Sequence, residues 1–223
     1  MDKQLLKQAL TKFFAGVILM GLLLFLPAGT WQYPGAWLLC GLLFVPMFAA
    51  GLVMLKKAPD LLRKRLDAKE KLGTQKAVIG LSALMFVGGF VLAGLDFRFG
   101  WTRVPLWLTL VSAALFLLGY GLFAEVLREN AWLSRTVEIQ QGQQVVDTGL
   151  YGLVRHPMYS ATLLLFLAMP LILGSWLSFL VFLIYPPTIV KRLKSEEELL
   201  KRELLGYETY CEKVKYRLIP YIY

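Results

Sequence analysis

The sequence contains few of the residues on which metal and nucleophilic chemistry usually depends. Histidine occurs once among 223 residues, at His156, and the two cysteines, Cys40 and Cys211, lie far apart. One histidine cannot supply an HExxH site or another histidine-based metal cluster, and the cysteines lack the CxxC spacing of zinc and redox sites. GxGxxG and P-loop motifs are also absent. We therefore expect no metal site, no Ser-His-Asp triad, no Rossmann site and no structural disulfide.

Charged residues are absent from long stretches of the chain. Hydrophobic residues make up 57% of it, against about 45–50% in a typical soluble domain, and the mean hydropathy is +0.59. Four apolar blocks reach the roughly 20 residues that a membrane-spanning helix needs; they are about Phe13–Trp31, Ala36–Leu55, Ala77–Leu95 and Val104–Leu127. A fifth apolar block, Met158–Val190, is divided by Gly174 and Ser175 into two short pieces, which indicates a tight hairpin. The sequence thus predicts an all-α, polytopic integral membrane protein with about six transmembrane helices, the last two a short hairpin.

The positive charge is distributed asymmetrically. The net charge is +9, and of the lysines and arginines only Arg98 and Arg103 fall on one side of the predicted membrane. The others lie in the segments 1–12, 56–76, 128–157 and 191–223. Under the positive-inside rule, the side of the membrane that carries these four lysine- and arginine-rich segments is cytoplasmic. We expect both termini in the cytoplasm, a location in the cell inner membrane, and contacts with membrane lipids rather than nucleic acid.

The chain divides into two functional regions. Residues 1–127 form a four-helix transmembrane region, and the loop 56–76 is predicted to include a short surface helix. No ionisable residue lies in the middle of a predicted span, which disfavours transport. Residues 128–223 combine a connecting segment, the hairpin and a charged tail, and most of the notable polar residues lie here. We expect the tail to be helical and to pack back on the hairpin.

The stretch "YGLVRHPMY" marks the start of the hairpin. Proline is tolerated at the first position of a helix, so Pro157 predicts a helix start with His156 at its entrance. Free backbone N–H groups and the positive end of the helix dipole favour anions there. Arg155 and His156 could instead be simple anchors at the membrane interface.

The stretch "KRLKSEEELL" follows the hairpin directly. Arg192 and Glu196 are four residues apart and share one helix face, with Glu197 beside them. Such a pair can be an ordinary surface ion pair, yet its position brings it to the membrane surface opposite Arg155. Further on, Tyr207, Tyr210, Val214 and Arg217 have 3, 4, 3 spacing, which places them on one helical face. A packing stripe is the alternative for that face.

Taken in order, these elements resemble the isoprenylcysteine carboxyl methyltransferase family, integral-membrane enzymes related to the phosphatidylethanolamine N-methyltransferases. The resemblance runs from about Gln143 to Pro220, through "VVDTGLYGLVRHPMY", the hairpin, the double glutamate and "GYETYCEKVKYRLIP". It implies that S-adenosylmethionine binds on the cytoplasmic side without a Rossmann fold. It implies these cofactor-binding residues: Val145, Val146, Tyr151, Arg155, His156, Pro157, Met158, Tyr159, Glu196 and Glu197.

The resemblance also implies the residues at the acceptor. Arg192 would contact the substrate and, with Glu196, form the catalytic pair; Tyr207, Tyr210 and Arg217 would complete the substrate site. The register of the glutamates allows either Glu196-Glu197 or Glu197-Glu198 as the functional pair, and the spacing from Arg192 favours the first.

The expected reaction is methyl transfer to a lipophilic or prenylated acceptor, most simply the carboxylate of an isoprenylcysteine-like molecule. A carboxylate is already ionised at pH 7, so the reaction needs positioning rather than a general base, in keeping with a single histidine. Methylation of a lipid amine or small thiol is an alternative. A membrane reductase using NADPH, with a related C-terminal module, and a non-catalytic scaffold are alternatives of other classes.

Overall fold

The computed structural model describes residues 3–66, 73–133 and 139–223, and every regular element in these ranges is helical. The all-α prediction is therefore confirmed. The elements are α1 (Lys3–Ala28), α2 (Pro34–Lys57), α3 (Pro59–Leu66), α4 (Gly73–Phe99), α5 (Leu106–Glu129), the 3-10 turn η1 (Gly149–Gly152), α6 (Pro157–Ile172), α7 (Trp176–Phe182), α8 (Tyr185–Glu203) and α9 (Tyr207–Lys213). The short surface helix expected between the second and third spans is α3.

Within the described residues, five segments are long and apolar enough to cross a membrane: α1, α2, Val78–Phe99 of α4, α5, and the segment Trp176–Glu203 that α7 and α8 form together. The predicted hairpin is present, and its first arm is α6. At 16 residues, α6 is about 24 Å long, shorter than a hydrocarbon core of about 30 Å. The chain reverses at Gly174, whose φ of 81° is a left-handed conformation that favours glycine.

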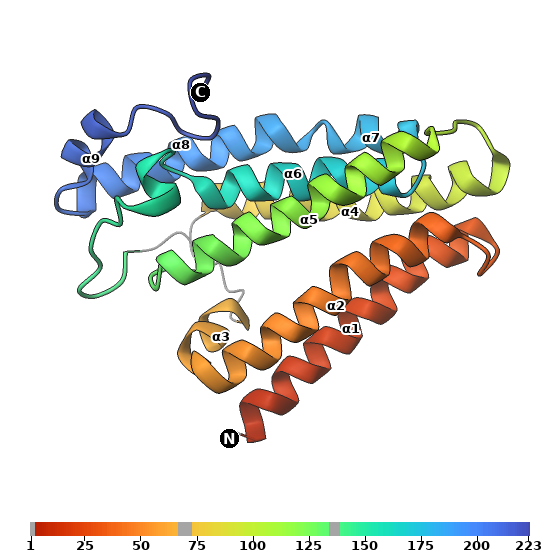
Figure 1. The fold of residues 1–223 in the computed structure, drawn as a ribbon, viewed down its shortest axis with the longest axis horizontal. Coiled ribbons are helices and arrows are strands. Elements are labelled where there is room, and N and C mark those ends of the chain that lie inside the picture. The colour runs from red at the N-terminus through yellow and green to blue at the C-terminus, as the bar shows by residue number, and fades with distance from the viewer. Residues whose placement is uncertain (1–2, 67–72, 134–138) are drawn as a thin grey trace.

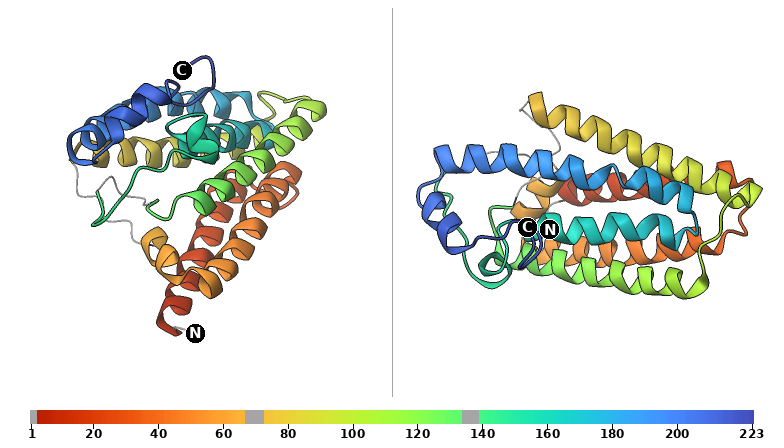
Figure 2. Two further views of the ribbon diagram at one scale, coloured as in Figure 1. Left: turned by 60° about the vertical axis from the view of Figure 1, so that its left-hand side comes forward. Right: turned by 90° about the horizontal axis from the view of Figure 1, so that it is seen from above.

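Helices α4, α5, α6, α7 and α8 run roughly along one axis (Figures 1 and 2). Helix α5 packs along α6, α4 packs on α7 and α8, and α1 contacts both α2 and α4. Toward the N-terminus, α1 and α2 diverge from the rest as a separate pair (Figure 1). Helix α9, η1 and the C-terminal tail gather at one end of the bundle. This end carries the candidate site.

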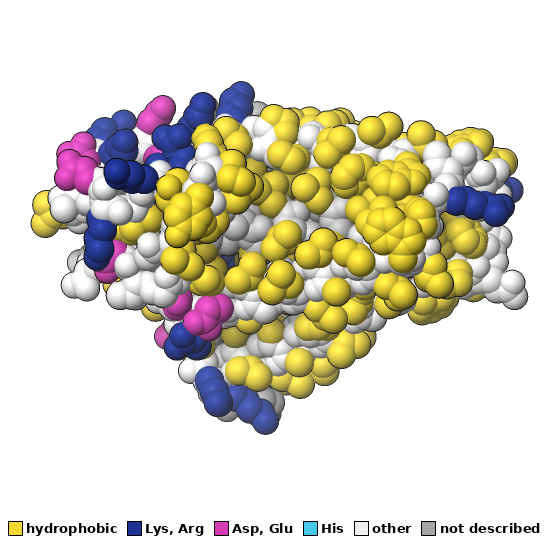
Figure 3. Space-filling view, turned by 45° about the horizontal axis from the view of Figure 1, so that its top comes forward, with side chains coloured by type: hydrophobic (Ala, Val, Ile, Leu, Met, Phe, Trp, Pro, Cys, Tyr) yellow, Lys and Arg dark blue, Asp and Glu magenta, His cyan; other side chains and the backbone are white. Residues whose placement is uncertain are grey.

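The surface has an apolar middle and polar ends. Hydrophobic side chains cover the long central part of the face in Figure 3, and the charged side chains gather mainly at the end formed by α8 and α9. Large apolar residues in the middle are exposed because lipid, rather than water, would surround them. Ile18 and Leu118, for example, are exposed near the middle of α1 and α5. The molecule therefore has the surface of a multi-pass membrane protein.

The end opposite the candidate site is held by buried polar contacts. Asp96, at the end of α4, is 1% exposed and accepts hydrogen bonds from the Thr102 backbone N–H, the Thr102 hydroxyl and the Ser175 hydroxyl. Tyr33 Oη donates to the Leu173 carbonyl at 2.7 Å. These bonds fasten the tip of the hairpin to α4 and to the start of α2. They fix the far ends of α6 and α7 and so help to orient the site-bearing ends of the hairpin.

Candidate active site

A cavity opens at the charged end of the bundle, between the start of α6, the last turns of α8, α9 and the segment that leads into η1. Most of the residues predicted to bind cofactor or substrate line it, although they come from four separate parts of the chain. The lining residues are Asn130, Leu133, Gln143, Gln144, Val145, Val146, Tyr151, Arg155, His156, Met158, Tyr159, Glu196, Leu200, Leu204, Tyr207 and Tyr210.

The start of α6 is built as the sequence predicted. Pro157 is the first helical residue and His156 is its N-cap. The residues before it pair with the C-terminal tail: the backbone N–H groups of Arg155 and His156 donate to the carbonyls of Tyr216 and Arg217, each at 2.9 Å. The tail thus packs back against the entrance of the hairpin, which confirms the sequence-based expectation.

Glu197 is the centre of the buried charge network. Its carboxylate is 3% exposed and accepts hydrogen bonds from Arg155 Nε at 2.7 Å and Arg217 Nε at 2.8 Å. His156 Nε2 lies 3.2 Å from the same carboxylate. The anion that contacts the Arg155 and His156 side chains is therefore a side chain of the protein itself.

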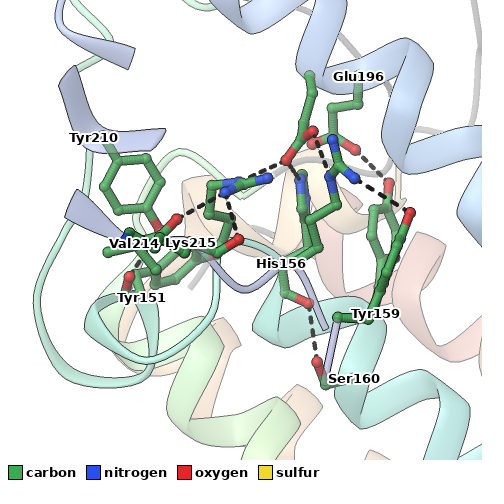
Figure 4. A network of polar contacts seen from close by, with 12 residues as sticks. Tyr151, His156, Tyr159, Ser160, Glu196, Tyr210, Val214 and Lys215 are labelled. Atoms are coloured by element: carbon green, nitrogen blue, oxygen red, sulfur yellow. Dashed lines mark hydrogen bonds and ion pairs between the residues drawn. The ribbon is translucent and has the colours of Figure 1, made fainter. Parts of the chain in front are cut away.

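The Arg155 side chain also fixes the tail. Its Nη1 donates to the carbonyls of Val214 and Lys215, at 2.7 and 3.0 Å (Figure 4). These two carbonyls therefore have hydrogen-bond partners although they lie outside a helix. The structure corrects one expectation here, because α9 ends at Lys213 and neither Val214 nor Arg217 shares a helical face with Tyr207.

A second polar chain joins α6 to α8 beside the first. Tyr159 Oη donates to Glu196 Oε2 and accepts a hydrogen bond from Arg192 Nε at 3.1 Å. In Figure 4 the Tyr159 ring extends from α6 toward Glu196. Arg192 and Glu196, one turn apart on α8, are therefore bridged by a tyrosine, and both its hydrogen-bond roles are used. Glu196 and Tyr159 line the cavity, and Arg192 lies next to it.

The opposite wall depends on Tyr151. Its carbonyl accepts from Tyr210 Oη at 2.7 Å, and its hydroxyl accepts from Asn130 Nδ2 at 2.8 Å. Burial raises the pKa of Tyr151 to about 12, so its hydroxyl stays protonated at neutral pH. The Glu129 carboxylate accepts the Leu150 N–H at 2.9 Å and holds η1 in place. Gly149 fits there with φ of +55°, since an added Cβ would lie 1.6 Å from Glu129 Oε1.

The structure thus brings the three sequence stretches together. Ten of the residues predicted to contact cofactor or substrate line the cavity: Val145, Val146, Tyr151, Arg155, His156, Met158, Tyr159, Glu196, Tyr207 and Tyr210. The other four lie behind or beside the cavity wall: Pro157, Arg192, Glu197 and Arg217. Sequence reasoning missed Leu200 and Leu204, although their positions four and eight residues after Glu196 placed them on the same side of the chain. It also missed Asn130 and Leu133, which lie before the stretch that carried the resemblance.

Comparisons with known proteins cover part of the chain that carries this cavity. Residues 107–205 match the family model of the phospholipid methyltransferases, a segment that runs from α5 to just beyond α8. A 91-residue stretch is 33% identical to the Delta(14)-sterol reductase TM7SF2 of Mus musculus, covering 40% of this chain and 22% of that protein. The chain therefore aligns with about a fifth of the length of this curated relative. The family-model match supports a membrane methyltransferase.

Proposed function

We propose that the chain transfers a methyl group from S-adenosylmethionine to a lipophilic acceptor, with the carboxylate of an isoprenylcysteine-like molecule as the acceptor that suits the site best. The observation that carries this proposal is the Arg192–Tyr159–Glu196 chain at the edge of the cavity. It places a guanidinium, suited to an acceptor carboxylate, one helical turn from a carboxylate, suited to a cationic donor. The family-model match supports the same reaction class.

The cavity residues fit the methyl donor. Leu133, Val146, Leu200 and Leu204 offer aliphatic walls to an adenine ring, and Glu196 offers a negative charge to a cation. Arg155 contributes to the lining, and its Nη2 has no hydrogen-bond partner among the described residues, so it can receive a carboxylate. When bound, S-adenosylmethionine supplies an electrophilic methyl group on a positively charged sulfur. The adenine, the charged sulfur and the carboxylate of that molecule thus each have a candidate partner in the cavity wall.

The protein's part in the reaction is to position groups and exclude water. Arg192 pairs with the acceptor carboxylate, in the geometry that guanidinium and carboxylate groups favour. Tyr159 holds Arg192 and Glu196 at a fixed separation, which aligns the acceptor with the donor. Because the acceptor is already ionised, no side chain needs to remove a proton. His156 therefore takes no part in proton transfer in this proposal, and its side chain contacts Glu197 instead.

The reductase likeness makes NADPH the rival cofactor. NADPH carries three phosphate groups, and protein sites commonly meet phosphates with arginine or lysine. Among the described lining residues the basic side chains are Arg155 and His156, which are too few for three phosphate groups. His156 contacts Glu197, and Arg155 has only Nη2 left for a ligand. The cavity therefore favours a ligand with one carboxylate and a cation over a ligand with several phosphates.

Methylation of an amine is the rival reaction. An amine acceptor arrives protonated and requires a base, and Glu196 is the carboxylate that lines the cavity. One Glu196 oxygen already accepts the Tyr159 hydroxyl, and the lone pair used in that bond is not available to take a proton from an amine. The site thus favours an acceptor that needs no base.

Calorimetric titration of the purified protein in detergent tests the cofactor. We expect S-adenosylhomocysteine to bind with saturable heat and NADPH to give none at the same concentrations. A Glu196→Ala variant controls for binding elsewhere and should lose most of the heat in a matching titration with S-adenosylmethionine, whose charged sulfur the proposal places near Glu196. Saturable binding of NADPH alone would contradict the proposal.

A further inference from the structure

The side-chain hydroxyl group of Tyr207 is buried and lacks a hydrogen-bond partner among the described residues. The residue follows Gly206, whose φ of +84° turns the chain from α8 into α9, and it is 4% exposed. An unpaired buried hydroxyl costs about 1–3 kcal/mol, and such groups in native proteins usually have a reason.

Two comparisons within the structure show that this is specific to the cavity. Tyr210, one turn along α9, also lines the cavity, but its hydroxyl is satisfied by the Tyr151 carbonyl at 2.7 Å. Ser112 Oγ is the other buried side-chain atom in the described ranges that lacks a partner, and it does not line the cavity. Only at Tyr207 do a buried, unpaired donor and the cavity wall coincide within those ranges.

The surroundings of Tyr207 restrict what it can bind. Its ring packs with Leu204, Tyr210 and Val214, and Val145 and Leu200 lie against the same cluster. Burial, and next the negative charge of Glu197, raise the pKa of the Tyr207 hydroxyl, so it remains a hydrogen-bond donor at neutral pH. Glu196 adds negative potential at the same place. An anionic acceptor is disfavoured there, whereas an uncharged nitrogen or oxygen is not.

We propose that the Tyr207 hydroxyl donates a hydrogen bond to an uncharged acceptor atom of the nucleoside part of the methyl donor. This rests on the proposed function. The aliphatic neighbours Leu200, Leu204 and Val145 receive the flat base, and Tyr207 supplies the polar contact that orients it. Tyr207 is thereby a cofactor-binding residue, whereas the sequence resemblance grouped it with the acceptor.

The test compares Tyr207→Phe with Tyr210→Phe, two substitutions that each remove one hydroxyl from α9. Tyr207→Phe should weaken binding of S-adenosylhomocysteine about tenfold, the effect of one lost hydrogen bond that leaves a buried acceptor unpaired. The unfolding temperature of its ligand-free form should be unchanged or higher, because an unpaired polar group is removed. Tyr210→Phe should lower that temperature, because the Tyr151 carbonyl loses its donor.

Adenosine locates the contact within the ligand. If Tyr207 contacts the nucleoside, Tyr207→Phe should weaken adenosine binding by the same factor as S-adenosylhomocysteine binding. Weaker binding of S-adenosylhomocysteine alone would place the contact in the amino-acid part and overturn the assignment. Equal binding by Tyr207→Phe and wild type would also overturn it, as would a fall in ligand-free stability like that of Tyr210→Phe. Failure of the wild type to bind S-adenosylhomocysteine would refute the proposed function instead.

Discussion

Replacing Glu197 with alanine is expected to unfold the charged end of the protein. Glu197 is the shared partner of Arg155 and Arg217, and its own carboxylate is buried. Removing one partner of a buried ion pair leaves charge without compensation and typically costs about 3–5 kcal/mol. Arg155 also holds the tail through the Val214 and Lys215 carbonyls, so its displacement would release the segment that covers the helix entrance.

Thermal unfolding and limited proteolysis in detergent measure this effect. Glu197→Ala should unfold at a markedly lower temperature and be cleaved in the tail after residue 213. Glu198→Ala is the matched control: the neighbouring carboxylate is exposed on the same helix, so both measurements should resemble wild type. Glu197→Gln retains hydrogen-bonding atoms without the charge and should fall between them. Glu197→Ala with wild-type stability would show that the network is not what holds this end.

Glu196→Ala and Arg192→Ala are expected to abolish methyl transfer without unfolding the protein. Both residues are half-buried at the cavity edge, where water can replace the lost groups. Arg192 makes charge-assisted hydrogen bonds to the acceptor in the proposed reaction, each worth about 1.5–3 kcal/mol, so kcat/KM should fall about 100-fold or more. Glu196→Ala should in addition weaken binding of the methyl donor.

Separate measurement of binding and turnover distinguishes the two roles. Arg192→Ala should bind S-adenosylmethionine nearly as wild type does, whereas Glu196→Ala should not, because the charged sulfur loses its counter-charge. Arg192→Lys retains a charge without the two-pronged geometry and should recover only part of the activity. Lys194→Ala, an exposed cation on the same helix, should leave turnover unchanged. Turnover retained in Arg192→Ala or Glu196→Ala would remove the respective residue from the site.

Local features of the sequence predicted much of this architecture. Uncharged apolar blocks specify spans because the bilayer leaves the backbone no other partner, and Pro157 specified the start of α6 through its missing N–H. The spacing of Arg192 and Glu196 identified one face of α8. Each of these signals is contained within a few turns of one helix.

The features that escaped prediction depend on distant segments. The periodicity after Tyr207 suggested one continuous helix, but the chain leaves it because Arg155 takes the Val214 and Lys215 carbonyls. The role of Glu197 as internal counter-ion follows from that return of the tail. Asp96 likewise gains its partners from Thr102 and from Ser175, 79 positions away. No local pattern encodes such pairings.

Methyl transfer itself tests the central claim most directly. The protein, reconstituted in lipid vesicles, would be given S-adenosylmethionine labelled with tritium on its methyl group and an N-acetyl-S-prenylcysteine acceptor. A carboxyl methyl ester releases its label as volatile methanol in alkali, whereas a methylated amine or thiol does not. We expect label in the acceptor that alkali releases, and none with Arg192→Ala. No transfer to any lipophilic acceptor by a protein that binds and oxidises NADPH would contradict the account.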